Sequence, residues 1–171
     1  MHAGDPLKGQ PLSEDDVRAV LDTVLDPEVP VLSIVDLGIV RHVRVAGDAV
    51  TVGLSPTYSG CPATEVIEQS VQRALTRAGC ANVHLERVLS PPWTTRWISA
   101  AGRQKLLNYG IAPPTEDHDS KRALLGEDRP MRCAHCRSEH TERVSEFGST
   151  PCKALYRCID CREPFEYFKC I

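Results

Sequence analysis

The chain has 171 residues, an apolar fraction of 42% and a formal net charge of −3, which suit one domain or one domain with a small module. The balanced charge argues against bulk attraction to nucleic acid or to a membrane surface, and no stretch is long and apolar enough to span a bilayer. Because the N-terminus lacks the apolar segment of a secretory signal, we expect a cytoplasmic protein whose eight cysteines serve metal or redox chemistry.

The first part of the chain predicts a helix followed by a hairpin. Ser13 and Asp16 have the spacing of a capping box, and apolar residues after them recur every three or four positions. A proline ends this helix, and residues 26–38 form an irregular loop. Alternating apolar residues then predict two strands, over 39–45 and 50–54, joined by a tight turn.

A second helix is predicted from Pro62 to Gly79. Its apolar residues lie on one face, with proline at its first turn and glycine at its end. A third strand is predicted over 83–89, and a short helix over 100–109. The order is therefore helix, strand, strand, helix, strand, before the chain reaches its cysteine-rich end.

This order predicts an α+β fold, with a small two-layer α-β-β-α-β domain and a C-terminal zinc-ribbon-like module. The predicted boundaries are a flexible tail at 1–12, the domain at 13–111, a linker at 112–130 and the module at 131–171. A module of this size cannot build a large core, so a metal would supply much of its folding free energy.

Four cysteines of the module form two CxxC pairs, Cys133 with Cys136 and Cys158 with Cys161. Each pair can offer two thiolates from one turn, and both pairs together supply a closed tetrahedral site. We expect structural zinc there, although rubredoxin-type iron uses similar ligands and two disulfides are the plain alternative. His135 lies inside the first pair, where its side chain normally points away from the metal, so four cysteines are preferred.

Cys61 is the second chemical feature, because it lies where the second helix begins. Unpaired N–H groups and the positive end of the helix dipole favour a thiolate there, and the hydroxyl of Thr57 could hydrogen-bond it. A small buried residue at a helix cap is an equally good interpretation. Asp26 and Asp36 flank the preceding loop and could orient a metal or cluster, although local capping is favoured for each alone.

Two more cysteines of the module, Cys152 and Cys170, lie outside the CxxC pairs. One interpretation makes them spare thiols or alternates in the shared metal site. The other assigns them to a second, labile site in which Cys152 joins Cys61, since iron–sulfur clusters prefer thiolate ligands and Lys153 favours a thiolate beside it.

Three short motifs resemble those of a known family: Asp26-Pro27-Glu28, Asp36-Leu37-Gly38 and Thr57-x-x-x-Cys61-Pro62. They are similar to the signature of the small domain shared by SufT-like iron–sulfur assembly factors. The tail F-G-S-T-P-C-K-A-L-Y-R-C-x-x-C-R-E-P-F resembles that of the PaaD family, the D components of bacterial phenylacetyl-CoA epoxidase systems. The resemblance, which covers residues 13–171, implies that Cys61 is the reactive cysteine. The surrounding signature that it implies is Asp26, Glu28, Asp36 and Thr57.

The resemblance implies an accessory or maturation factor in aerobic phenylacetate catabolism, rather than an enzyme. The partners implied are the reductase or oxygenase subunits of the epoxidase, and the cargo is a transient iron–sulfur cluster or iron on Cys61. A structural or docking subunit without cluster transfer is the alternative, and a homodimer sharing a cluster through both Cys61 thiols is a further one. An enzyme is disfavoured, because no base pairs with Cys61 and a four-cysteine site leaves no open position.

Overall fold

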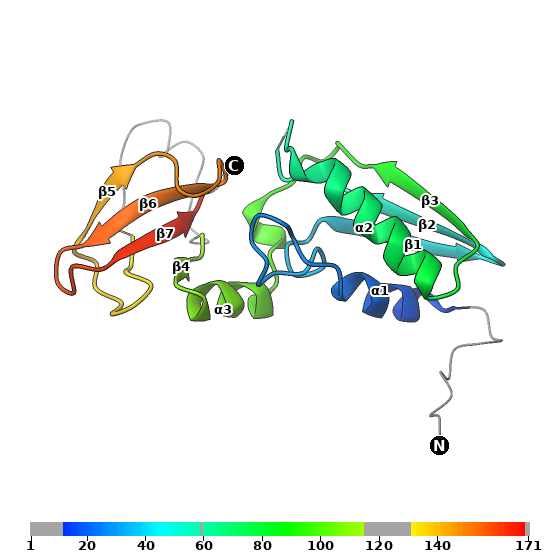
Figure 1. The fold of residues 1–171 in the computed structure, drawn as a ribbon, viewed down its shortest axis with the longest axis horizontal. Coiled ribbons are helices and arrows are strands. Elements are labelled where there is room, and N and C mark those ends of the chain that lie inside the picture. Colours follow the sequence, from blue (N-terminus) through cyan, green and yellow to red (C-terminus); the bar gives the residue numbers. More distant parts are fainter. Residues whose placement is uncertain (1–11, 59, 115–130, 170–171) are drawn as a thin grey trace, which may run out of the picture. The chain divides into compact units, whose positions relative to one another are not determined.

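The computed structural model describes residues 12–58, 60–114 and 131–169, so most of the predicted tail and linker lie outside the described residues. The chain separates after Trp93 into two compact units (Figure 1). Its elements run α-β-β-α-β in the N-terminal unit and then form a small second sheet, which confirms the predicted α+β class. Within those described ranges, no helix is long and apolar enough to cross a membrane.

Helix α1 (Glu14–Asp22) opens the N-terminal unit and begins with the predicted capping box. The Ser13 hydroxyl accepts a hydrogen bond from the Asp16 N–H at 3.2 Å, and the Asp16 carboxylate accepts one from the Ser13 N–H at 2.9 Å. Val17 and Leu21 on the apolar face are fully buried. Helix α1 is therefore fixed at its start by local hydrogen bonds and along its length by burial.

Three strands form the sheet of this unit in the order β1 (Val40–Ala46), β2 (Ala49–Leu54) and β3 (Asn82–Arg87). The first two are antiparallel, which confirms the hairpin, and β3 runs parallel to β2. A parallel pair needs a crossover, and α2 (Ala63–Arg77) provides it across one face of the sheet (Figure 1). Because β2 and β3 are parallel, the segments that follow them emerge at the same end of the sheet.

The C-terminal unit begins with a 3₁₀ turn, Thr95–Trp97, and helix α3 (Ala100–Asn108). Its sheet has the strand order β4-β7-β6-β5, in which only β4 and β7 are parallel neighbours. The strands are β4 (Ile111–Ala112), β5 (Thr141–Ser145), β6 (Lys153–Cys158) and β7 (Pro164–Phe168). Residues 100–111, which the sequence assigned to the first domain, thus group here with the ribbon strands, and the predicted domain boundaries stay a prediction.

Candidate functional site

Cys61 lies in the loop between β2 and α2, directly before the Pro62 that caps α2. The loop turns tightly, because the Cys61 N–H donates to the Tyr58 carbonyl at 3.3 Å and the Thr64 N–H donates to the Cys61 carbonyl at 3.2 Å. Gly60 has a φ of +83°, a conformation that favours glycine. The backbone thus presents a half-buried thiol at the first turn of α2.

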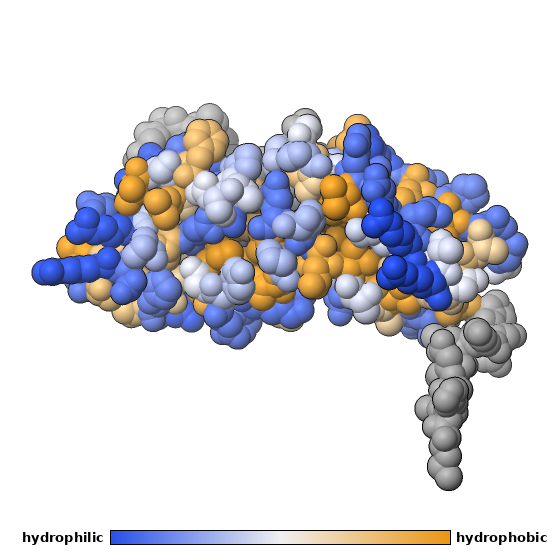
Figure 2. Space-filling model, in the orientation of Figure 1, coloured by the Kyte–Doolittle hydropathy of each residue, from blue (hydrophilic) through white to orange (hydrophobic). Residues whose placement is uncertain are grey.

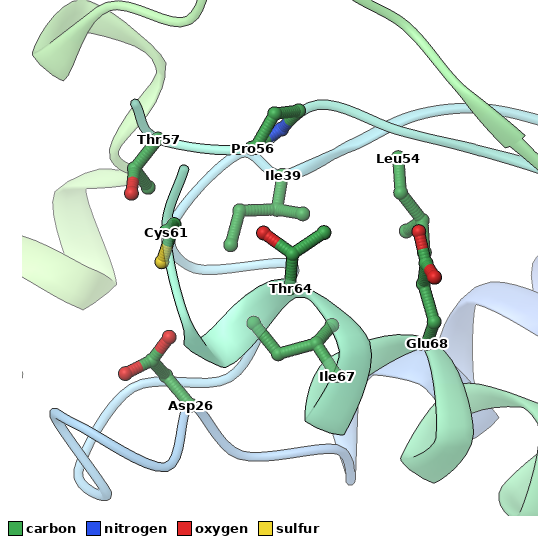
Figure 3. A pocket seen from close by; sticks show the side chains of 9 residues that line it. All are labelled: Asp26, Ile39, Leu54, Pro56, Thr57, Cys61, Thr64, Ile67 and Glu68. Atoms are coloured by element: carbon green, nitrogen blue, oxygen red, sulfur yellow. The ribbon is translucent and has the colours of Figure 1, made fainter. Parts of the chain in front are cut away.

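A small pocket lies on one side of Cys61, with a volume of about 20 Å³, which is room for about one water molecule. Apolar side chains and thiol, hydroxyl and carboxyl groups line it together: Asp26, Ile39, Leu54, Pro56, Thr57, Cys61, Thr64, Ile67 and Glu68. We call this small pocket the inner pocket. Figure 3 shows Cys61 and Asp26 at one end of it and Glu68 at the other. The thiol therefore meets a surface of mixed polarity.

An open groove of about 630 Å³ also borders Cys61. Its lining comes from the loop, the start of α2 and the end of β3: Pro56, Gly60, Cys61, Pro62, Thr64, Glu65, Arg87 and Leu89. Leu89 is 68% exposed, so the groove has an apolar side chain at the surface. Cys61 thus stands between a small pocket and a large open groove, where a partner could reach the thiol from solvent.

An ion pair between α2 and the end of β3 joins the two cavities. Arg87 Nε lies 2.6 Å from Glu68 Oε1, and Arg87 Nη2 lies 2.9 Å from Glu68 Oε2. Hydrogen bonding to Arg87 holds the pKa of the Glu68 carboxyl below its ordinary value, although burial acts in the opposite sense. The sequence analysis missed this pair. Glu68 lies seven residues after Cys61, and this helical spacing could have indicated that it shares a face of α2 with Thr64 and faces the same pocket. Arg87 lies on β3 and gave no local signal.

Asp26 has two roles in this unit. Its side-chain Oδ1 accepts hydrogen bonds from the N–H groups of Glu28 at 2.9 Å and Val29 at 2.7 Å, which orders the loop after α1. The same buried residue lines the inner pocket with Cys61 and Thr57. Cys61 and two of its four predicted signature residues therefore line one pocket.

The other two signature residues, Glu28 and Asp36, are not among the residues that line either cavity. The Asp36 carboxylate accepts a hydrogen bond from the Ser33 N–H at 3.2 Å, and the Ser33 hydroxyl accepts one from the Asp36 N–H at 2.9 Å. Ser33 also donates to Asp22 at 2.5 Å. Asp36 thus bonds the backbone of its own loop, as in the local capping that the sequence favoured, and Ser33 links this loop to the end of α1.

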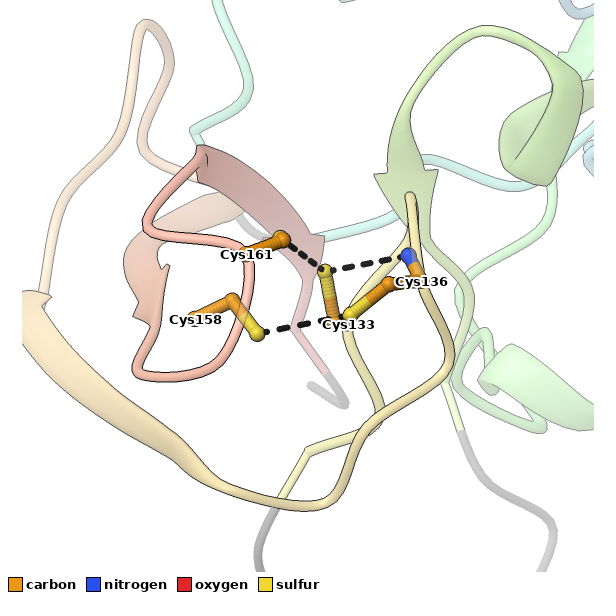
Figure 4. A group of neighbouring side chains, drawn as sticks. All are labelled: Cys133, Cys136, Cys158 and Cys161. Atoms are coloured by element: carbon orange, nitrogen blue, oxygen red, sulfur yellow. Dashed lines mark hydrogen bonds between the residues drawn. The ribbon is translucent and has the colours of Figure 1, made fainter.

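The four CxxC cysteines converge in the C-terminal unit, with all four sulfurs within 4.8 Å of one another (Figure 4). The Cys133 and Cys161 sulfurs are 3.7 Å apart, and the Cys136 and Cys158 sulfurs are 3.5 Å apart. A tetrahedral metal with bonds of about 2.3 Å to sulfur places its ligands about 3.8 Å apart. The cluster therefore fits a metal bound by four thiolates.

The two CxxC turns have matching backbone geometry. The Cys133 N–H donates to the Ser138 carbonyl at 2.8 Å, and the Cys158 N–H donates to the Glu163 carbonyl at 3.0 Å. Each turn is followed by an arginine with positive φ, 68° at Arg137 and 63° at Arg162. The backbone N–H of Cys161 chiefly lowers the pKa of the Cys158 thiol, to about 7. The turns thus position all four thiols, and the backbone favours the thiolate form at Cys158.

The remaining cysteines lie apart from this cluster. Cys152 is buried, with the Thr150 hydroxyl oxygen 3.1 Å from its sulfur, and Cys170 lies outside the described residues. Cys61 and Cys152 belong to different units, so their predicted joint site stays a prediction. Burial raises the pKa of the Cys80 thiol, which suits a structural residue. The His135 ring lies 3.2 Å from the Pro164 carbonyl, and His135 is not among the clustered ligands.

Comparison with known families also finds two parts in the chain, an assembly domain followed by a zinc ribbon. Residues 14–84 match a family described as iron–sulfur cluster assembly protein, and residues 117–169 match the PaaD zinc beta ribbon domain. A protein of Escherichia coli (strain K12), named as the D component of a "Putative 1,2-phenylacetyl-CoA epoxidase", is 49% identical over 156 residues, which are 91% of this chain and 92% of that protein. An Fe-S protein maturation auxiliary factor of Porphyromonas gingivalis is 34% identical over 51% of this chain and 84% of its own length.

Solved structures resemble the N-terminal part of the chain. A domain of unknown function, DUF59, from Bacillus anthracis has a TM-score of 0.52 and 27% identity, and covers 54% of this chain and 90% of its own. A conserved hypothetical protein from Thermotoga maritima has a TM-score of 0.51 and 29% identity, and covers 57% of this chain and 97% of its own. Both support the same α+β fold for the unit that carries Cys61.

Proposed function

The chain belongs to the PaaD family, the D components of phenylacetyl-CoA epoxidase systems, and on this basis we propose that it is an accessory maturation factor rather than a catalyst. Its role is to deliver an iron–sulfur cluster or iron to the reductase or oxygenase subunits of the epoxidase of aerobic phenylacetate catabolism. The assembly-family match and the maturation factor from Porphyromonas gingivalis support a role in iron–sulfur maturation.

The observation that carries this proposal is the position of the Cys61 thiol between a small pocket and an open groove. A cargo that is passed on needs a ligand that a second protein can replace, so one side of the site must be open. The pocket side supplies the Asp26 carboxylate and the Thr57 and Thr64 hydroxyls, and the groove leaves access for a client. Thiolate is a ligand that iron and its sulfur clusters prefer.

The four-cysteine cluster has a different part in the proposal. Its sulfur spacing and its match to a zinc ribbon family support zinc, and a site closed by four thiolates leaves no position for cargo. The metal would stabilise the C-terminal unit, whose strands are short. The ribbon is then the module that presents a fixed surface to the partner subunits.

Metal analysis of the full chain purified without oxygen tests the proposal. The wild-type protein, reconstituted with iron and sulfide, should hold one equivalent of zinc together with iron, acid-labile sulfide and a visible cluster spectrum. Cys61→Ala should keep the zinc and lose the iron, sulfide and spectrum. Cys80→Ala is the matched control, because this buried thiol lines neither cavity, and it should keep all of them.

Delivery itself is tested in cells that make the epoxidase subunits together with either variant. The reductase or oxygenase should be isolated under-loaded with cluster or iron when Cys61→Ala replaces the wild type, and fully loaded with Cys80→Ala. Full loading of both clients with Cys61→Ala would refute the delivery role.

The name of the relative from Escherichia coli favours a second candidate, since it describes a part of the epoxidase itself. In this alternative the chain is a structural or docking component, and Cys61 is only a residue at a helix start. Stable co-purification with oxygenase subunits at fixed stoichiometry, unchanged by Cys61→Ala, would support it. A delivery factor should instead separate from its client once the client is loaded.

A further inference from the structure

Figure 2 shows one face of the molecule, on which hydrophobic and hydrophilic residues are intermixed. The free edges of the two sheets are a separate kind of surface that a partner strand can bind. Proteins protect free strand edges by keeping them short, bulged or charged. Three of the four edges are protected in this way. β4 has two residues, and register shifts interrupt β5 between Arg143 and Ser145 and β1 between Val40 and His42.

The fourth edge, β3, is neither short nor bulged, and its charged residues, Glu86 and Arg87, are paired within their own unit. Its six residues pair with β2 in one unbroken register, and it contains no proline or lysine. Among the described residues, no strand pairs with its other side. A regular edge of this kind is a template for the addition of another strand.

The free edge exposes the backbone groups of alternate residues. The Val88 N–H donates to the Leu54 carbonyl of β2 at 2.8 Å, so the groups of Val88, and of His84 and Glu86 at two-residue intervals, point toward β2. The intervening residues, Val83, Leu85 and Arg87, therefore direct their N–H and C=O groups away from β2. A strand added at this edge must pair with those three residues.

The polar side chains of β3 are bonded to other elements of the same unit. Asn82 donates to Asp48 at 2.7 Å, and Arg87 is bound to Glu68 of α2. The Glu86 carboxylate lies 3.0 Å from His42 Nε2, across Gly53 of the middle strand. A side chain at position 53 would collide with the His42 ring, because its Cβ would lie 2.2 Å from the nearest ring atom. Only the Oε2 oxygen of Glu86 takes part in these bonds, and its side chain is 50% exposed, so Glu86 can still interact with a neighbouring strand.

We propose that the β3 edge binds a second copy of this chain, strand against strand and antiparallel. Pairing Leu85 with its own copy places Val83 opposite Arg87, so that all three outward-pointing residues form hydrogen-bonded pairs. The same register places His84 opposite Glu86 of the second copy, and Glu86 opposite its His84. These lie in the closer, non-hydrogen-bonded positions, where side chains interact most strongly. The two neighbouring registers, in which Leu85 lies opposite Val83 or Arg87, do not place His84 opposite Glu86. The register that pairs Leu85 with Arg87 places Glu86 opposite Glu86 of the second copy.

This pairing has a consequence for the Cys61 groove, which is lined by Arg87 and Leu89. At about 3.4 Å per residue, an antiparallel pair centred on Leu85 separates Arg87 from its copy by about 14 Å along the strands, and would separate Leu89 from its copy by about 27 Å if the strands continued. The two grooves then open at opposite ends of the shared sheet. Each Cys61 would take further ligands from a client, and a cluster bridging the two Cys61 thiols is not expected.

The test is sedimentation equilibrium of the full chain over a wide concentration range, with two complementary charge variants. His84→Glu places two Glu–Glu contacts in each dimer and should raise the dimer dissociation constant at least about tenfold. His84→Lys/Glu86→Lys should also weaken self-association. An equimolar mixture of the two variants should recover the dimer as a heterodimer. Gln72→Glu, on the exposed face of α2, controls for the change in net charge.

Amide hydrogen exchange identifies the strand that pairs. In the wild-type dimer the N–H groups of Val83, Leu85 and Arg87 should exchange slowly, and in His84→Glu they should exchange quickly. A wild-type monomer at all concentrations would overturn the proposal. If those three N–H groups exchanged slowly in that monomer, another part of the same chain would cover the β3 edge. If they exchanged quickly, the edge would be free to bind a different protein. A dimer that survives both charge variants would place the interface elsewhere and overturn it as well. None of these outcomes depends on cluster delivery.

Discussion

The two cysteine sites of this chain hold their thiols in opposite ways. In the C-terminal unit, four sulfurs lie within 4.8 Å of one another on two matched turns, and Cys133 and Cys158 are fully buried. In the N-terminal unit, Cys61 stands half-buried at a helix start, with a small pocket on one side and an open groove on the other. A closed set of ligands suits a permanent metal, whereas one accessible thiol suits a cargo that is exchanged.

The largest expected effect comes from removing a ligand of the closed site. Cys158→Ser should weaken zinc binding by more than about 100-fold, because the loss of a direct ligand exceeds the 10- to 100-fold effect of an outer partner. Without metal the C-terminal unit should lose its fixed structure while the N-terminal unit keeps its own. Competition with a chelator measures the affinity, and the spread of amide resonances from each unit reports its folding.

Cys80→Ser is the matched control for this variant, since Cys80 is buried but lies outside the cluster. It should bind zinc as the wild type does. Unchanged zinc affinity in Cys158→Ser would mean that Cys158 is not a zinc ligand. The C-terminal site would then not be closed by four thiolates, and the contrast with Cys61 would fail.

A smaller effect is expected on the unfolding free energy of the N-terminal unit, where a core residue and Cys61 can be compared. Leu75 on α2 is fully buried, so Leu75→Ala should cost about 2–5 kcal/mol of its unfolding free energy. Cys61→Ala should cost less than about 1 kcal/mol, because the thiol is only half-buried at the surface of a loop. Denaturant unfolding followed by Trp93 fluorescence measures both, in a Trp97→Phe background that leaves one tryptophan.

Trp93 suits this measurement because it is 4% exposed and its indole N–H donates to the Leu37 carbonyl at 2.9 Å within the same unit. If Cys61→Ala proved as destabilising as Leu75→Ala, Cys61 would be a core residue and its loss of cargo would carry no functional meaning.

The sequence predicted features that depend on short spacings. The Ser13 capping box, the hairpin and the helix after Pro62 follow from local patterns, and all three are observed. The closeness of the four CxxC sulfurs agrees with the pairing that their spacing predicts. Each of these needs only neighbouring residues, or two similar turns, to be recognised.

Features that depend on distant contacts were not predictable in the same way. β4 has only two residues and pairs with β7, which lies more than fifty positions later, so no periodicity announces it. Arg87 meets Glu68 from 19 residues away and gave no local signal. The spacing also could not decide between Asp26 and Asp36, because both bond the backbone of the same loop and only Asp26 lines the pocket.

The smallest expected effect concerns the ion pair at the edge of the open site. Because hydrogen bonds from Arg87 lower the folded-state pKa of Glu68, the pair contributes stability above the ordinary carboxyl range and loses it as the pH falls through that lowered pKa. Arg87 is 55% exposed at its side chain, so solvent screens the pair and its contribution to stability should be small.

A carboxyl-carbon NMR titration of Glu68 in the folded chain measures this directly. Arg87→Gln should raise the titration midpoint of Glu68 toward the ordinary value, and Arg87→Lys should restore only part of the difference, because an ammonium cannot make both hydrogen bonds. Asp16 serves as the internal reference, because hydrogen bonds from Ser13 and not from Arg87 lower the pKa of its carboxyl, and its midpoint should stay the same. An unchanged Glu68 midpoint in Arg87→Gln would mean that solvent screens the pair completely. The groove beside Cys61 would then have no fixed cation, and its recognition of a partner would rest on shape and on the thiol.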